Sequence, residues 1–140
     1  MPTDLPPELI AAYEATEFRV FAAHPFTLRT GSFSPELEAA FREYGVQSAT
    51  FITAWNPLGE ACDNATNAAQ QGKLTETVSS MGLASLPGIG VDPTGDWAGE
   101  ESLLVMGLDQ AAASALGQQF QQNAIVWGGA DAVPRLILLR

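Results

Sequence analysis

The sequence predicts an α/β or α+β fold with a single central mixed β-sheet flanked by helices. Short apolar runs typical of strands alternate along the chain with longer segments of helical periodicity. The 140 residues are 46% hydrophobic and 16% charged, which is typical of a globular chain long enough to bury a core. We therefore expect one globular domain over residues 1–140, with no internal repeat or linker.

The N-terminal part of the chain predicts a helix and a pair of short strands. Pro6 and Pro7 start a helix that runs to about residue 16, because proline in a first turn gives up no intrahelical hydrogen bond. Residues 18–21 and 25–29 alternate with the period of strands. The inward stripe of the helix is expected to consist of Leu9, Ile10 and Tyr13.

The middle of the chain predicts helix, strand and helix. Ser34 is a cap residue followed by proline and two acids, so a helix should begin there and end at Gly45. Residues 49–55 form a strongly apolar strand that stops at Asn-Pro. A long polar helix over residues 58–81 is expected to follow.

The C-terminal part predicts four strands and one helix. Residues 83–91 and 102–108 are read as strands, the first of them irregular. Asp109 can cap a helix that ends near residue 121, with Asn123 closing it in a left-handed conformation. The last two strands are expected at residues 124–127 and 136–139.

The final strand is apolar at consecutive positions, so both of its faces need cover. We expect the helices that begin at Pro35 and Leu58 to bury it inside a monomer, with a symmetric homodimer as the alternative.

Charge and composition exclude several classes of function. The net charge of −10, without any basic stripe, argues against nucleic-acid binding. No apolar run is long enough for a membrane helix and the N-terminus lacks the features of a signal peptide, so a soluble, cytoplasmic location is expected. Cys62 and His24 are the only cysteine and histidine, so we expect no structural metal and no cofactor. A transient Mg²⁺ on Glu100 and Asp96 stays open.

Polar residues gather at the predicted ends of the strands and helices, where α/β domains often place their sites. Each also has a structural explanation: Thr53 could bond within the sheet, Asn56 could cap the following helix, and Gln122 and Asn123 could cap the helix before the next strand. Asn67 shares a helix face with Leu74 and Val78, so we expect it to be buried and hydrogen-bonded to another element. The candidate ligand-binding residues are Thr53, Asn56, Asn67, Trp97, Glu100, Gln122 and Asn123.

Other reactive residues fit known chemistries poorly. His24 lies in a predicted turn and Cys62 has no histidine beside it to activate it, so neither supports nucleophilic catalysis. The Gly-rich segment 86–90 lacks the Lys-Ser/Thr that follows a phosphate-binding loop.

A family resemblance rests on the order of several short motifs. They are Tyr13-x-x-Thr16, the segment 51–57, Asn67 with Leu74, Trp97-x-x-Glu100, and Phe120-x-Gln122-Asn123-Ala124. In this order the chain resembles the bacterial family known as domain of unknown function 3293 (DUF3293). The family pattern has Glu-Pro-Ser where this chain has Glu100-Glu101-Ser102, which changes the start of that strand and the aim of Glu100. The resemblance implies a single cytoplasmic domain and brings no activity with it.

Two classes of function stay open. In the first, the candidate residues converge on a pocket for a small polar metabolite, nucleoside- or sugar-like, with Trp55 or Trp97 as its wall. Glu100 is then the best candidate for a general acid or base, although the sequence does not say whether the protein is an enzyme. In the second, the polar residues are structural and the acidic surface is a protein-interaction or inhibitory module. The two classes differ in whether these side chains share one cleft, and we expect Asn56 and Glu100 to lie together.

Overall fold

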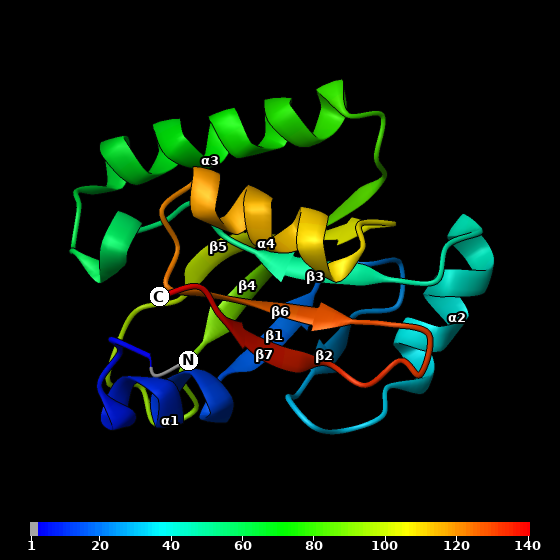
Figure 1. Ribbon diagram of the computed structural model, residues 1–140, viewed down its shortest axis with the longest axis horizontal. Helices are drawn as coiled ribbons and strands as arrows, with labels where there is room; N and C mark the ends of the chain where they lie inside the picture. Colours follow the sequence, from blue (N-terminus) through cyan, green and yellow to red (C-terminus); the bar gives the residue numbers. More distant parts are fainter. Residues whose placement is uncertain (1–2) are drawn as a thin grey trace.

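The computed structural model describes residues 3–140, which contain one seven-stranded sheet and four α-helices. Figure 1 shows the sheet in the middle of the molecule with helices on both sides. In chain order the elements are α1 (Pro7–Ala15), β1 (Glu17–Val20), β2 (Phe26–Leu28), α2 (Pro35–Tyr44), β3 (Ala49–Ile52), a 3₁₀ turn η1 (Pro57–Gly59), α3 (Asn64–Ser80), β4 (Ser85–Val91), β5 (Glu100–Met106), α4 (Gln110–Gln119), β6 (Ala124–Gly128) and β7 (Arg135–Leu138).

The single sheet flanked by helices is confirmed, but the prediction that it is mixed is wrong. Its strand order is β2-β1-β4-β5-β3-β6-β7, and every neighbouring pair is antiparallel. The helices α3 and α4 do connect parallel strands, β3 to β4 and β5 to β6. In each case an antiparallel strand fills the space between the two: β5 separates β3 from β4, and β3 separates β5 from β6.

Two apolar layers cover the two faces of the sheet. On one face α3 and α4 lie side by side over a cluster that includes Ile52, Leu74 and Leu116 (Figure 1). The other face carries α2, whose Leu37 and Phe41 pack in the second cluster. The helix α1 lies on the same side as α2 but at the opposite end of the sheet (Figure 1). This arrangement leaves the end of the sheet beneath α1 free to form a site.

Local sequence signals fixed several helix ends as predicted. The Ser34 hydroxyl accepts a hydrogen bond from the backbone N–H of Leu37, and Gly45 ends α2 in the left-handed conformation. Asp109 caps α4 through the N–H of Ala112.

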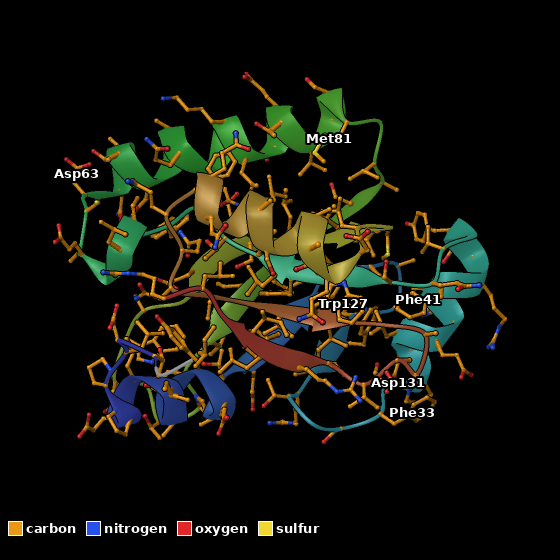
Figure 2. All side chains as sticks on the ribbon, in the orientation of Figure 1. Phe33, Phe41, Asp63, Met81, Trp127 and Asp131 are labelled. Carbon is orange, nitrogen blue, oxygen red and sulfur yellow. The ribbon has the colours of Figure 1, made fainter. Side chains whose placement is uncertain are left out.

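Two expected helix boundaries are wrong. The long helix begins at Asn64 rather than residue 58, because Leu58 has φ 59° and Asp63 accepts the capping bond. Figure 2 shows Asp63 and Met81 at the two ends of this helix. At the end of α4 the left-handed residue is Gln121, with φ 56°, and Asn123 is left for another role.

The C-terminal strand β7 is an edge strand that pairs with β6. Leu136 packs against the α2-side cluster, whereas Ile137 and Leu139 pack against the other. The helix α4, which the sequence did not predict as cover, also lies against this end of the chain: a Cβ on Gly117 would lie 2.6 Å from Leu139 Cδ1. The strand is half-buried, which is less than the sequence predicted.

Within residues 3–140, no helix combines the length and the apolar character needed to cross a membrane.

The two glycines of β4 that face the α1 and α2 side have different surroundings. A Cβ on Gly88 would lie 2.6 Å from the Arg19 carbonyl oxygen and 2.8 Å from Phe51 Cε2, so the core requires glycine there. A Cβ on Gly90 would meet only Thr16 Cγ2, at 3.7 Å, an ordinary contact. The core is therefore closed over Gly88 and open over Gly90.

This contrast predicts that Gly88→Ala destabilises the protein by about 1–3 kcal/mol, because backbone and an aromatic ring must move. The control Gly90→Ala should stay within about 0.5 kcal/mol of wild type. Urea unfolding measures both variants, and equal midpoints would contradict the assignment of Gly88 to the closed part of the core.

Candidate functional site

A cavity of about 400 Å³ lies between α1 and the sheet, within the usual size range for small-molecule sites. Six of the seven predicted site residues line it: Thr53, Asn56, Trp97, Glu100, Gln122 and Asn123. The seventh, Asn67, lies behind the lining.

The floor of the cavity follows from strand register. Phe18 pairs with Gly90, and Gly90 pairs with Glu100, so the three residues form a row across β1, β4 and β5. Directly opposed residues project to the same face of a sheet. Because Gly90 has no side chain, Phe18 and Glu100 stand on either side of an open space. The cavity is therefore a consequence of one small residue in the middle of this row.

Aromatic residues form part of the remaining wall. Phe18 and Phe51 make an edge-to-face contact with ring centroids 5.2 Å apart. Tyr13 from α1 and the indoles of Trp55 and Trp97 complete the set of aromatic residues that line the cavity. A ligand in this space would contact several ring faces.

A chain of amide hydrogen bonds holds Glu100 in place. Asn67 is 1% exposed, and its Oδ1 accepts from the backbone N–H of Asn56 at 2.8 Å. Its Nδ2 donates to Asn56 Oδ1 at 2.9 Å and to the carbonyl oxygen of Cys62 at 3.3 Å. Asn56 Nδ2 in turn donates to Glu100 Oε2 at 3.0 Å. The expected burial of Asn67 and the expected proximity of Asn56 and Glu100 are both confirmed.

Asn56 is not the helix cap that the sequence allowed. It has φ 47° and ψ 63°, and its side chain makes no capping bond to the turn that follows. Instead Asn56 Oδ1 accepts from the backbone N–H of Cys62 at 3.1 Å, closing the loop that leads into α3. Asparagine tolerates this left-handed conformation better than most residues. Five side-chain and backbone hydrogen bonds made by Asn56 compensate the strain of its backbone.

Glu100 lies in an environment that opposes ionisation. Burial raises the pKa of its carboxyl group, and the hydrogen bond from Asn56 offsets only part of this effect. Four salt bridges occur among residues 3–140 and none of them includes Glu100. Its Oε1 also has no hydrogen-bond partner among these residues, so one carboxyl oxygen is free for a ligand.

A second polar group faces Glu100 from α1. Asn123 Nδ2 donates to the Tyr13 hydroxyl at 3.1 Å, and Arg140 Nη1 donates to Asn123 Oδ1 at 2.9 Å. Burial raises the pKa of Tyr13, and the charge of Glu100 adds to this, while Asn123 and Arg140 act in the opposite direction. Asn123 therefore orients Tyr13 rather than closing a helix. The phenol keeps its own proton for donation.

Three other predicted residues have defined local partners. The Thr53 hydroxyl donates to the Glu101 carbonyl oxygen at 2.6 Å, so it bonds within the sheet. Gln122 Nε2 donates to the carbonyl oxygens of Trp55 and Phe120, each at 3.2 Å, which ties the end of α4 to the segment after β3. Trp97 lines the cavity and is half-buried.

Trp55 carries a buried polar atom that lacks a partner. Its Nε1 makes no hydrogen bond within residues 3–140, although a buried N–H normally has one. Trp55 also lines the cavity, but its Nε1 is itself buried and is not shown to face that space.

The sequence did not single out Tyr13, Phe18, Phe51 or Arg140 as site residues. Tyr13 was expected on the inward stripe of the first helix, which was the available signal. The two phenylalanines appeared only as strand residues, because strand order decides which of them become neighbours.

No cluster of three or more His, Cys, Asp or Glu residues occurs in the described part of the chain. Asp96, considered above with Glu100 for Mg²⁺, does not line the cavity, and its backbone N–H donates to Asp92 Oδ2 in a turn. Cys62 Sγ contacts the carbonyl oxygen of Glu60 at 3.5 Å.

Comparison with known proteins gives one match. The family described as "Protein of unknown function (DUF3293)" matches residues 52–125, a segment that contains Thr53, Asn56, Asn67, Trp97, Glu100, Gln122 and Asn123. No curated protein and no solved structure matches the chain.

The amide chain predicts that Asn67→Leu destabilises the protein by about 1–3 kcal/mol, because Asn56 and Cys62 would lose buried partners. Asn64→Leu is a matched control, since Asn64 is exposed in the first turn of the same helix. Chemical unfolding of both variants decides the matter: equal, small losses would mean that Asn67 is not a structural centre of the site.

The environment of Glu100 predicts a pH-dependent effect of Glu100→Gln. Because the folded-state pKa is raised, the folded protein binds this proton more tightly than the unfolded chain, and wild-type stability falls as the pH rises through that window. Removing the ionisable group should therefore raise the melting temperature above that of the wild type at neutral pH. This difference in melting temperature should disappear at pH values below the ordinary pKa of a glutamate. The glutamine oxygen can still accept from Asn56.

Melting temperatures between about pH 4 and pH 8 would measure this effect. Glu101→Gln, which removes the adjacent and exposed carboxyl group of the same strand, is the charge-matched control. A Glu100→Gln variant that is less stable at neutral pH, or equally shifted at every pH, would contradict the assignment.

Proposed function

The chain belongs to the DUF3293 family of proteins of unknown function, and we propose that it binds a small polar metabolite, nucleoside- or sugar-like, in the cavity beneath α1. The observation that carries this proposal is the Glu100 carboxyl group, which has no cationic partner within residues 3–140 and is held by Asn56 beside the aromatic residues of the cavity. A purely structural acid would be expected to have a cationic or multiple hydrogen-bonding partner.

The chemistry of the lining fits a flat ligand with a polar edge. Aromatic rings offer faces for stacking on a base or on the apolar face of a sugar. The free groups differ in kind: Glu100 Oε1 accepts, whereas the Tyr13 hydroxyl can donate. A ligand that presents a donor and an acceptor along one edge satisfies both.

The amides contribute mainly by positioning. Hydrogen bonds join Asn67 to Asn56 and Asn56 to Glu100. Another joins Asn123 to Tyr13. Few hydrogen-bonding groups of these amides are therefore left for a ligand. This refines the amide-rich pocket that the sequence predicted: the groups that contact the ligand are Glu100, Tyr13 and the aromatic walls. Convergence on one cavity also supports a binding pocket over the alternative of an acidic interaction module.

Glu100 is also the best candidate for acid–base chemistry in this site. A carboxyl group whose pKa is raised by burial holds its proton closer to neutral pH, as general acids do. The Tyr13 phenol on the α1 side of the cavity could orient the group that receives or loses this proton.

Screening nucleosides, nucleotides and sugars by thermal shift and tryptophan fluorescence tests the proposal. A ligand at 100 times its dissociation constant should add about 2.7 kcal/mol to stability. Trp55 and Trp97 should report binding directly, because both line the cavity, whereas the Trp127 indole donates to the Leu108 carbonyl oxygen elsewhere.

Filling the cavity provides the control. Gly90→Val adds a branched side chain to the floor and should reduce affinity at least about tenfold, while Gly90→Ala, which adds one carbon, should have a much smaller effect. Binding that is unchanged in a folded Gly90→Val protein would place the ligand outside this cavity and contradict the proposal.

A further inference from the structure

We propose that the ligand of this cavity carries an organic ammonium group, which binds between the Glu100 carboxylate and the aromatic walls. The inference rests on the proposed function and narrows its ligand class to amines, for example amino sugars or aminated nucleosides.

The first argument is the charge balance of the cavity. Among the described residues that line it, Glu100 is the only one with a formal charge. Its sole hydrogen-bond partner within residues 3–140 is the neutral amide of Asn56. Arg140 acts on Tyr13 and Asn123 but makes no salt bridge with Glu100. A carboxylate withdrawn from water without a cation is costly, and a cationic ligand removes this cost.

The second argument is the composition of the walls. Five aromatic side chains line the same space as Glu100: Tyr13, Phe18, Phe51, Trp55 and Trp97. Ring faces attract ammonium groups, most strongly where solvent is excluded, and tryptophan is the most favourable partner. Neutral sugars and bases also stack on such rings, but they do not compensate the charge of Glu100.

The third argument concerns the protein as a whole. The net charge of −10 creates a field that attracts cations and repels anions such as nucleotides. This field acts on every cation, so it cannot provide specificity by itself. Specificity for an ammonium group depends on Glu100 and on the rings.

Pairs of probes that differ in one group test the inference. Glucosamine and glucose differ by an ammonium in place of a hydroxyl, and so do benzylamine and benzyl alcohol. At neutral pH, titration calorimetry or ligand-observed NMR should show each ammonium compound binding at least about tenfold more tightly than its neutral partner.

Variants assign this preference to the site. Glu100→Gln should reduce it to about twofold or less, whereas Glu101→Gln, which removes the same charge from the adjacent exposed position, should leave it intact. Trp97→Leu keeps an apolar side chain in the wall but removes the aromatic ring. It should weaken the binding of the ammonium compounds more than that of the neutral compounds.

The possible outcomes separate the two proposals. If the neutral compounds bind as well as the amines, the ammonium inference fails and the binding cavity stands. A preference that survives in Glu100→Gln would come from the overall charge and would also overturn the inference. Absence of binding by all four compounds up to about 10 mM overturns it too, and the nucleoside and sugar screen then decides the proposed function separately.

Discussion

The buried amide of Asn67 is the constraint on which the site depends. At 1% exposure it must find partners inside the protein, and it finds them on both the backbone and the side chain of Asn56. Those bonds hold Asn56 in a left-handed conformation and direct its Nδ2 toward Glu100. One helix, the segment after β3 and the start of β5 are thereby joined through three side chains. The helix α3 therefore holds Glu100 in position through Asn67 and Asn56.

The second determinant is the uneven filling of one sheet face. Over Gly88 the ring of Phe51 closes the core, whereas over Gly90 the space is left open beneath α1. The helix α2 packs its Leu37 and Phe41 on the opposite end of the same face. The packed core and the candidate site thus lie at different ends of one face of the sheet. The boundary between them falls between Gly88 and Gly90 of β4.

Local chemistry made much of the fold predictable from the sequence. The Ser34 and Asp109 caps, the alternating strands and the inward register of Asn67 depend on neighbouring residues, and all three are confirmed. The mixed sheet was wrong because connections alone do not reveal that β5 and β3 insert between parallel strands. The predicted helix start at Leu58 was wrong for a similar reason. The helical spacing of Leu58 with later alanines could not show that Asn67, within the helix, hydrogen-bonds to Asn56 in the loop before it.

The sequence predicted which residues form the candidate site better than it predicted what each of them does there. Polar residues at strand ends were expected to converge, and six of the seven do line one cavity. Which of them are free for a ligand depends on partners distant in sequence, such as Tyr13 with Asn123. Trp55 and Trp97 were expected as wall residues, but the part of the wall that Phe18 and Phe51 contribute could be recognised only from the strand order. Sequence periodicity predicts which face of a strand a residue lies on, but it does not predict which strands are neighbours in the sheet.

The most direct test of this account is the titration of Glu100 by carboxyl ¹³C NMR in the wild-type protein and in Asn56→Ala. The account predicts that the pKa of Glu100 lies above its ordinary value in the free protein and rises further in Asn56→Ala, because a hydrogen bond to the carboxylate is lost. Binding of an ammonium compound should lower it. A Glu100 that titrates at the ordinary glutamate value, and does not respond to Asn56→Ala or to an amine, would contradict the claim that a desolvated carboxyl group held by Asn56 is the centre of the site.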